Sequence, residues 1–363
     1  MVIKTKELVQ VLNKISYINP NLAKLETKNK KLYIRTFNNY AKVQCEIDLK
    51  KNLDEFNILI NLKILSSLIS KINQDEINIV QESGKLTISY DRSNYNLNAM
   101  AEENFPDFSL VVDKSFVNTN LTLAQLGDIA RYVLGYATDG VGDGNKLSAT
   151  DCISIATKNK ALYAEATDIK RLAILKINDQ IKENLNLLIY NKTFSQLIHL
   201  LNANKNVQVF SNTKNLLVQT DNCIIEIDLI AQNFPDLVNA VKDQEENVVE
   251  IDVKTLIDRL ETGNSILGTS SFPIVNFGFK SKDLLLSFKN SEQGNACENI
   301  DYKKIKGEMP DFSININYML TALKNITSKT AKLSIKDNLS PLFVYDLSNQ
   351  NLLQVILPSK NIY

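Results

Sequence analysis

Side chains that commonly do chemistry are sparse in this chain of 363 residues. The single histidine, His199, lies in NKTFSQLIHLL, where apolar residues recur at helical spacing. Nucleophilic catalysis of the Ser/His/Asp kind needs a histidine beside a nucleophile and a carboxylate, and no such motif surrounds His199. We therefore interpret His199 as a structural residue of a helix.

The segment DGVGDGN, residues 139–145, combines glycines with acidic residues. A phosphate-binding loop would continue with Gly-Lys and then Ser or Thr, and this one does not. A calcium loop could use Asp139, Asp143 and Asn145 but would need a closing glutamate. We therefore expect a Gly/Asp turn, no metal, no cofactor and no enzymatic activity.

The four cysteines (Cys45, Cys152, Cys223 and Cys297) are far apart and form no CxxC motif. We expect free thiols in a reducing cytosol, and hence a cytoplasmic protein. The N-terminal MVIKTKELVQVLNKI lacks the apolar run of a signal peptide, and no stretch of about 18 apolar residues predicts a membrane span. The chain has 41 basic and 41 acidic residues, which argues against coating nucleic acid by bulk charge. A local basic face stays open.

Residues that could act must be positioned by elements that repeat along the chain. NFPD occurs at 104–107 and again at 233–236. Three helical segments start at Ile3, Leu121 and Ile251, and three more start at Asn61, Asn191 and Asn317. The aligned leucines of these helices are Leu8, Leu126 and Leu256 in the first set and Leu68, Leu197 and Leu323 in the second. Strand patterns repeat too, placing Leu32, Leu162 and Leu284, and also Leu86 and Leu216, in equivalent positions.

The repeat predicts an α+β protein of three tandem similar domains, each with two helices and antiparallel sheets. We place the domains at 1–116, 117–245 and 246–363. The asparagines at 61, 191 and 317 are candidate N-caps of the second helix in each copy. MPDF at 309–312 is out of register with NFPD, and we interpret it as a coincidence.

The six predicted helices carry a net charge of +6 in a chain whose overall charge is zero. One interpretation is a basic helical lining that contacts phosphates without reading sequence. The other is that the exposed faces of helices are simply rich in lysine. Charge alone leaves both open.

Four segments, in order and spacing, resemble the bacterial DNA sliding clamp, the beta subunit of DNA polymerase III. They are ATDIKRLAI (166–174), NFPDLVNAV (233–241), INYMLTAL (316–323) and the VILP near the C-terminus (355–358). The resemblance covers essentially the whole chain. It implies a DNA-clamp fold and a head-to-tail homodimer, in which six domains close a ring of pseudo-six-fold symmetry around double-stranded DNA.

The resemblance also implies a function and partners. The ring would be a processivity factor in DNA replication, binding DNA without sequence preference and tethering the catalytic subunit of the replicative polymerase. A clamp loader would place it on DNA, and no membrane is involved. An alternative is a scaffold or accessory clamp of the same fold with altered peptide preference.

Site residues follow from the resemblance in three groups. The partner-peptide cleft would be formed by Thr167, Ile169, Lys170, Arg171, Leu172, Pro235, Asn239, Tyr318, Leu339, Val355, Leu357 and Pro358. The DNA-facing residues would be Lys14, Lys63, Lys71, Arg131, Lys192 and Lys324. The dimer contact would place Phe105 on one side and Ile266 with Leu267 on the other, although each could instead be an ordinary core residue.

The chain departs from the family at three cleft positions. Ile169 and Lys170 stand where the family usually has Gly-His, and Asn239 stands where it usually has Arg. A β-branched residue takes a positive φ only at a cost, so we expect the turn at Ile169 to differ in shape.

Overall fold

The computed structural model describes residues 1–50, 56–138, 140, 147–178, 184–201, 206–242, 245–268, 270, 272–280 and 283–359, with only the backbone at 104. The chain divides into two compact units. The first comprises Met1–Gly127 and Lys192–Ala231, and the second comprises Asp128–Asn191 and Gln232–Tyr363. The predicted central domain thus contributes to both units, and the predicted domain boundaries stay a prediction.

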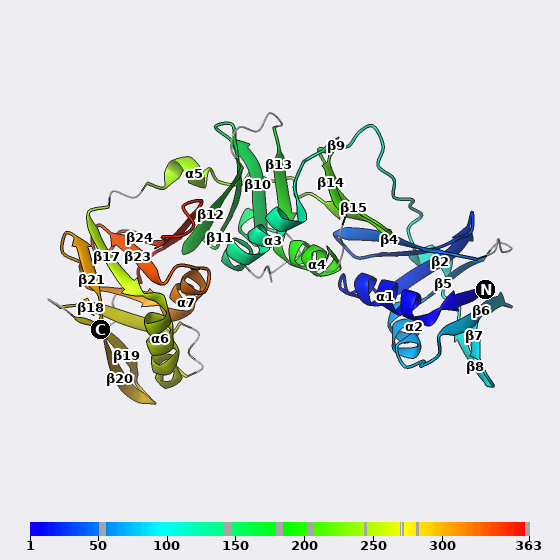
Figure 1. The fold of residues 1–363 in the computed structure, drawn as a ribbon, viewed down its shortest axis with the longest axis horizontal. Coiled ribbons are helices and arrows are strands. Elements are labelled where there is room, and N and C mark those ends of the chain that lie inside the picture. The colour runs from blue at the N-terminus through cyan, green and yellow to red at the C-terminus, as the bar shows by residue number, and fades with distance from the viewer. Residues whose placement is uncertain are drawn as a thin grey trace. The chain divides into compact units, whose positions relative to one another are not determined.

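The first unit is built on an eight-stranded antiparallel sheet (Figure 1). In sheet order its strands are β5 (Asn57–Asn61), β2 (Leu22–Lys28), β3 (Lys31–Phe37), β4 (Ala41–Asp48), β16 (Cys223–Asp228), β15 (Asn215–Thr220), β14 (Val207–Ser211) and β9 (Val117–Asn118). A second sheet orders β1 (Val2–Lys4), β6 (Glu76–Glu82), β7 (Lys85–Tyr90) and β8 (Ser93–Asn98).

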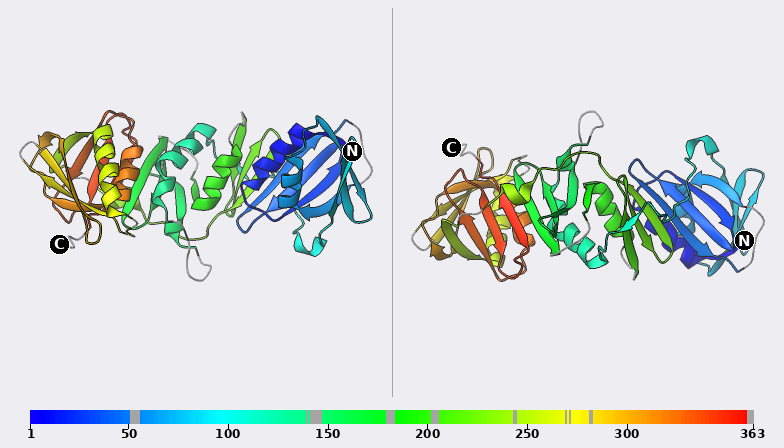
Figure 2. Two further views of the ribbon diagram at one scale, coloured as in Figure 1. Left: turned by 90° about the horizontal axis from the view of Figure 1, so that it is seen from below. Right: turned by 90° about the horizontal axis from the view of Figure 1, so that it is seen from above.

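Two helices of the first unit, α1 (Thr5–Ser16) and α2 (Leu62–Ile69), pack together on one face of the long sheet (Figure 2). The inward face of α1 carries Leu8, Leu12 and Ile15, which are all buried. This i, i+4, i+7 spacing is the stripe that the sequence pattern predicts. The side chain of Asn61 accepts a hydrogen bond from the backbone N–H of Ile64, so its predicted role as the N-cap of α2 is confirmed.

The second unit is built on a nine-stranded antiparallel sheet. In sheet order its strands are β13 (Asn186–Tyr190), β10 (Cys152–Lys158), β11 (Ala161–Thr167), β12 (Arg171–Asn178), β25 (Leu352–Ile356), β24 (Leu342–Asp346), β23 (Thr330–Ile335), β17 (Asn247–Asp252) and β21 (Lys303–Lys306). The accompanying sheet orders β20 (Gly294–Asp301), β19 (Asp283–Asn290), β18 (Ile274–Phe279) and β22 (Phe312–Asn315).

Helices α6 (Val253–Leu267) and α7 (Ile316–Lys324) pack against each other in the second unit, and α6 also packs on β19 and β20. Their apolar faces join the strands in one core that includes Leu256, Phe288 and Leu323. The N-cap of α7 is Asn315, which accepts from the Asn317 N–H. The prediction that Asn317 caps this helix is wrong, because the helix begins at Ile316 and Asn317 is already its second residue.

The remaining elements are short or shared between the units. They are α3 (Leu123–Tyr132), α4 (Asn191–Leu201), α5 (Leu237–Ala240) and the 3-10 turns η1 (Glu102–Asn104), η2 (Leu134–Tyr136) and η3 (Ala149–Asp151). Asn191 is the first residue of α4, and its side-chain amide donates to the carbonyl of Thr138. The predicted capping role of Asn191 is therefore wrong, because its side-chain oxygen, which would have to accept from a backbone N–H of the helix, accepts no hydrogen bond.

The leucine alignment predicts the core well. Ten of the eleven aligned leucines are buried, and the exception, Leu68, is half-buried in α2. Each long sheet also crosses a repeat boundary, at β4 with β16 in the first unit and at β12 with β25 in the second.

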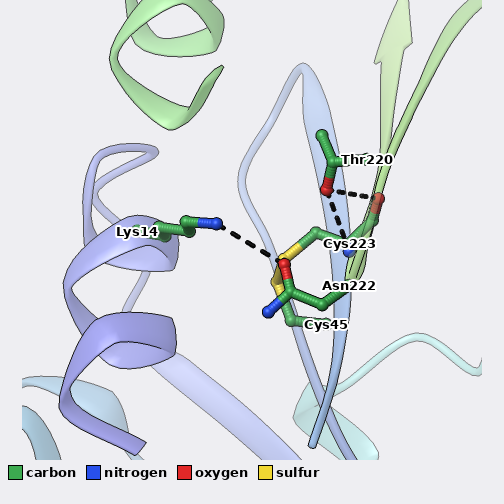
Figure 3. Close-up of a disulfide and its surroundings, with 5 residues drawn as sticks. All are labelled: Lys14, Cys45, Thr220, Asn222 and Cys223. Atoms are coloured by element: carbon green, nitrogen blue, oxygen red, sulfur yellow. Dashed lines mark hydrogen bonds between the residues drawn. A yellow bond between two sulfur atoms is a disulfide. The ribbon is translucent and has the colours of Figure 1, made fainter. Parts of the chain in front are cut away.

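The expectation that all four cysteines are free thiols is wrong for two of them. Cys45 of β4 and Cys223 of β16 form a disulfide, with Cα atoms 4.1 Å apart across 178 residues of chain (Figure 3). They are direct partners in the ladder that joins the two repeats, so their side chains project from the same face of the sheet. Cys152 and Cys297 are free, the first buried and the second exposed.

Candidate functional site

The turn from β11 to β12 and the two strand ends that flank it contain five of the residues predicted for the partner-peptide cleft, Thr167, Ile169, Lys170, Arg171 and Leu172. Asp168 organises it, since its Oδ1 accepts from the backbone N–H groups of Lys170 and Arg171 at 3.0 and 2.9 Å. The Thr167 hydroxyl donates to the Arg171 carbonyl at 2.8 Å and accepts from the Ile169 N–H at 3.0 Å. A side chain that bonds the backbone two residues on is the usual way for Asp to build a turn. The turn is therefore fixed by its own side chains.

Ile169 adopts a φ of +74° in this turn. A left-handed conformation at a β-branched residue costs about 1–3 kcal/mol and persists only where its surroundings enforce it. The hydrogen bonds from Thr167 and Asp168 provide that enforcement. The sequence predicts a turn of different shape because of this cost. Ile169 nevertheless takes the positive φ, since the hydrogen bonds of local polar side chains outweigh its intrinsic preference.

The side chain of Arg171 is enclosed by aromatic rings. Its guanidinium carbon lies 5.2 Å from the ring centre of Tyr136 and 4.5 Å from that of Tyr318. Its Nε donates to Asp168 Oδ2 at 2.9 Å, in a pair of which both side chains are largely buried. Stacking on aromatic faces suits the planar guanidinium better than it would suit a lysine. Arg171 thus links β12, η2 and α7.

This environment raises the pKa values of both tyrosines. Burial raises the pKa of Tyr136, and its hydroxyl donates to Gln354 Oε1 at 2.7 Å. Partial burial, together with the neighbouring Asp168 carboxylate, raises the pKa of Tyr318. Both phenols are therefore neutral donors at neutral pH. Tyr136 and Asp168 were missed by the sequence analysis, although an Asp next to a predicted turn is a usable signal.

The strand ends beside the turn carry the C-terminal residues predicted for the cleft. Leu172 pairs with Val355, Arg171 pairs with Ile356, and the Leu357 N–H donates to the Lys170 carbonyl at 2.8 Å. Val355 is buried, and Pro358 is half-buried. Leu339 is 74 % exposed and precedes β24, the strand next to β25. These residues meet at one end of three adjacent strands.

Pro235 and Asn239 belong to a second cluster, around α5. Lys158 of β10 forms an ion pair with Glu165 of β11 and another with Asp236, at 3.2 Å. Asn239 accepts from Asn159 at 3.4 Å and donates to Asp236 at 2.7 Å. Glu165 is fully buried, which raises the pKa of its carboxyl. This cluster fixes the NFPD segment to β10 and β11. Neither Lys158 nor Glu165 belongs to a motif by which it could have been predicted.

The predicted DNA-facing residues differ in how available their charges are. Lys63, Lys71, Arg131 and Lys192 are exposed. Lys324 is exposed but forms an ion pair with Glu261 of α6 at 2.7 Å. Lys14 bonds Asn222 at 3.4 Å beside the disulfide, where burial lowers the pKa of its ammonium group (Figure 3). The DNA-facing role of all six stays a prediction.

The predicted dimer-contact residues lie in two places. Phe105 packs edge-on against Phe37 and stacks with Phe108. Ile266 is half-buried, whereas Leu267 belongs to the core of the second unit. Leu267 also lines a cavity of about 930 Å³ between the end of α6 and the β19–β20 turn. Phe272, which lines it and is 73 % exposed, was missed by the sequence analysis.

Two sequence motifs considered for chemistry, His199 and the DGVGDGN segment, can be compared with the structure. No group of three or more His, Cys, Asp or Glu side chains there could hold a metal ion. His199 stacks on Tyr17 with ring centres 5.1 Å apart, as a structural role predicts. Apart from Gly140, the DGVGDGN segment lies outside the described residues. No described helix is long and apolar enough to cross a membrane.

Comparisons with known proteins agree along the whole chain. Models of the N-terminal, central and C-terminal domains of the DNA polymerase III beta subunit match residues 2–109, 141–236 and 240–360. The beta sliding clamp of Mycoplasma pneumoniae is 21% identical over 388 residues, covering 99% of this chain and 100% of that protein. The clamp of Mycoplasma capricolum is 22% identical over 337 residues, covering 84% of this chain and 88% of that one.

Solved structures share the fold. The DNA polymerase III subunit beta of Pseudomonas aeruginosa superposes with a TM-score of 0.89 at 17% identity, covering 99% of each chain. The pol III beta of Caulobacter crescentus gives a TM-score of 0.89 at 16% identity, again over 99% of each chain.

Proposed function

Since this chain belongs to the DNA polymerase III beta subunit family, we propose that it is a sliding clamp that encircles double-stranded DNA and tethers the replicative polymerase to it. The observation that carries this proposal is the match of all three family domains, in order, over nearly the whole chain. The clamp is a processivity factor: it keeps a polymerase on its template and has no reaction of its own.

The ring would consist of two copies of the chain joined head to tail. Such a heterologous contact gives a closed ring only when the last copy binds the first. Phe105 with its aromatic neighbours would supply one apolar surface. Half-buried Ile266 and exposed Phe272, beside the core residue Leu267, would supply the other. The contact would fill the cavity beside α6. A clamp loader opens the ring on DNA, and the protein acts in the cytoplasm.

A closed ring retains DNA by encircling it, so its contacts with the phosphates need only be weak and independent of sequence. The exposed Lys63, Lys71, Arg131 and Lys192 suit such contacts. Partner proteins bind as short extended peptides where the 167–171 turn meets Tyr318 and Leu357. A largely apolar surface with a few fixed polar groups is the usual form of such a site.

The test is retention on DNA. The clamp is loaded on nicked circular plasmid by a bacterial clamp loader with ATP, and the complex is then passed through a sizing column. We expect the protein to stay with circular DNA and to leave once a restriction enzyme linearises it. Equal retention on both forms would contradict encirclement. Native mass measurement gives an independent check, since a strict monomer at micromolar concentration would argue against the ring.

The alternative of an accessory clamp with altered peptide preference has one observation in its favour. Ile169 and Lys170 replace the usual Gly-His at the turn, and both side chains are exposed. Retention on circular DNA does not separate the two functions. The peptides that the clamp selects do separate them.

A further inference from the structure

The ladder between β4 and β16 joins the first repeat to the central repeat inside the first unit. Five residue pairs form it, beginning with Cys45 opposite Cys223. We call these residues, 41–45 and 223–227, the seam. The ladder between β12 and β25 crosses the next repeat boundary in the second unit and also has five pairs, but none contains a cysteine. One of two comparable junctions therefore carries a covalent cross-link.

The disulfide lies at one end of the seam. β16 begins at Cys223, directly after the turn formed by Asp221 and Asn222. Thr220 holds this end, because its hydroxyl donates to the Cys223 carbonyl at 3.1 Å and accepts from the Cys223 N–H at 3.0 Å (Figure 3). The ends of a ladder open at a lower free energy than its interior. Opening of this turn alone would expose the Cys223 sulfur without unfolding the sheet.

Both cysteines are shielded from solvent while the turn is closed. Cys223 is 5 % exposed, and Cys45 is fully buried. A cavity of about 90 Å³ adjoins them and is lined in part by Thr220, Asp221 and Asn222. A space of this size admits water molecules. A reductant therefore reaches the sulfur atoms only when the turn moves aside.

A cation lies next to the disulfide. The half-buried Lys14 of α1 points toward it, and its Nζ lies 3.4 Å from Asn222 Oδ1 (Figure 3). The same oxygen lies 3.6 Å from Cys223 Sγ. Asp221, the charged residue of the turn, is exposed. A neighbouring ammonium group stabilises a thiolate that attacks or leaves, and so assists thiol–disulfide exchange. A purely structural cross-link needs no such neighbour.

We propose that the disulfide between Cys45 and Cys223 is a redox switch that holds the seam closed when oxidised and lets β16 part from β4 when reduced. One thiolate of a dithiol attacks Cys223 Sγ, the S–S bond breaks, and Cys45 leaves as a thiolate that takes up a proton. The second thiolate of the reductant then attacks the mixed disulfide and releases Cys223, which is protonated in turn. The protein gains two electrons and two protons, and the reductant leaves as a cyclic disulfide. A small-molecule disulfide reverses the reaction.

The switch acts inside one subunit and does not require the proposed ring. It draws on the proposed cytoplasmic location in one respect. Where small thiols keep cysteines reduced, a protein disulfide is usually transient or redox-sensing. The position at the end of the ladder and the neighbouring Lys14 favour the same role.

The first experiment measures whether the folded protein can be reduced. Full-length Cys297→Ser, which lacks the exposed free thiol, is treated with dithiothreitol at several urea concentrations below the unfolding transition. Samples are alkylated with N-ethylmaleimide, and mass spectrometry follows residues 45 and 223. We expect reduction to be at least about tenfold faster than global unfolding and to depend little on urea, because only the turn opens. Reduction at the rate of global unfolding, with the same urea dependence, would overturn the switch and leave a static cross-link.

Two variants test which groups control access to the disulfide. Thr220→Val removes the hydroxyl that holds the turn and should speed reduction by about three- to tenfold. Lys14→Gln should slow reduction by about threefold. Lys6→Gln, at an exposed lysine of the same helix, is the matched control and should leave the rate unchanged. Global unfolding rates of each variant are measured in parallel. An unchanged rate in Thr220→Val would overturn the role of the turn, and equal rates in the two lysine variants would remove Lys14 from the mechanism.

Amide hydrogen exchange tests the consequence for the seam. Residues 41–45 and 223–227 should exchange about tenfold faster in the reduced protein than in the oxidised protein, and oxidised glutathione should restore their protection. The ladder between β12 and β25 is the internal control. Cys45→Ala/Cys223→Ala should behave like the reduced wild type and should not respond to dithiothreitol. If that variant does not fold, the wild type before and after reduction still gives the comparison. Unchanged exchange in the seam after complete reduction would overturn the switch.

Discussion

The guanidinium of Arg171 stacks on the ring of Tyr318, 4.5 Å from its centre, while its Nε bonds Asp168. Because this contact needs a planar cation, we expect Arg171→Lys to lower the free energy of unfolding by about 1–2 kcal/mol. Urea denaturation followed by circular dichroism measures the change. The matched control is Lys170→Ala, an exposed neighbour that should change stability by less than about 0.5 kcal/mol. Equal effects of the two variants would contradict the role of the stack.

The disulfide between Cys45 and Cys223 closes a loop of 178 residues. Closing long loops restricts the unfolded chain, so we expect the double variant Cys45→Ala/Cys223→Ala to be less stable by about 2–4 kcal/mol. Thermal unfolding with and without dithiothreitol should show the same loss in the wild type, and the double variant should not respond to the reductant. Cys297→Ser, at an exposed free thiol, is the control. A wild type that is insensitive to reduction would contradict this prediction.

Asp346 links the connection after α7 to the turn between β24 and β25. Burial by itself would raise its pKa, but hydrogen bonds from Ser348, Thr327 and Ser328 lower the pKa below its usual range. The stabilisation from a carboxylate with a depressed pKa is fully present above the pKa of the unfolded state, near 4. It is lost as pH falls through that value toward the folded pKa.

We expect the stability difference between wild type and Asp346→Asn to be about 1.5–3 kcal/mol at pH 7 and to shrink below pH 4. Urea unfolding at pH 7 and at pH 3.5 measures it. Asp337, an exposed carboxylate, provides the comparison variant, Asp337→Asn. A pH-independent difference for Asp346→Asn would count against this assignment.

Gly263 lies within α6, where a β-carbon would come within 2.3 Å of the Phe288 ring. Alanine normally favours a helix over glycine by about 1 kcal/mol, but here overpacking dominates. We expect Gly263→Ala to destabilise the protein by about 1–3 kcal/mol. Gly127 of α3 has no atom within 4 Å of its ideal β-carbon, so Gly127→Ala should be neutral or stabilising. Thermal unfolding of both variants measures the two changes in stability. If both variants were destabilised, the packing explanation would be contradicted.

Exposed and paired lysines should contribute differently to DNA binding. Lys63 and Lys71 are exposed on or just after α2, whereas Lys324 is paired with Glu261. We expect Lys63→Ala/Lys71→Ala to reduce the slope of log K against log salt by up to about 2. Lys324→Ala should change it less, and Glu261→Gln should tighten binding by freeing Lys324. Fluorescence anisotropy with a short duplex measures the slopes. An unchanged slope in the double variant would remove these lysines from the DNA-facing set.

Much of the fold was predictable, because burial periodicity is local. Leu8, Leu126 and Leu256 mark three helices in the sequence, and all three are buried in the structure. The pairing of β4 with β16 was not predictable, since it depends on which strand edges meet after each repeat has formed. The disulfide follows from that pairing, and spacing alone did not reveal it.

Some contacts of the candidate site could likewise be predicted from the sequence, and others could not. Resemblance placed Arg171 and Tyr318 together, and the structure brings them into contact. The resemblance could not predict the contact of Arg171 with Tyr136. Tyr136 lies in no motif and comes close to Arg171 only in the folded chain. The conformation of Ile169 also ran against its propensity, because Thr167 and Asp168 fix the turn through hydrogen bonds that a residue-by-residue preference does not include.

The central repeat donates strands to two different sheets, β14–β16 to one and β10–β13 to the other. Local unfolding follows hydrogen-bonded, packed units and does not follow sequence repeats. Amide hydrogen exchange should therefore report β14–β16 opening together with β2–β4, and β10–β13 opening together with β23–β25. A fragment cut at the repeat boundaries would expose two bare strand edges, which are templates for aggregation. A segment that could be moved intact to another protein would therefore consist of an outer repeat together with the strands of the central repeat that complete its sheet.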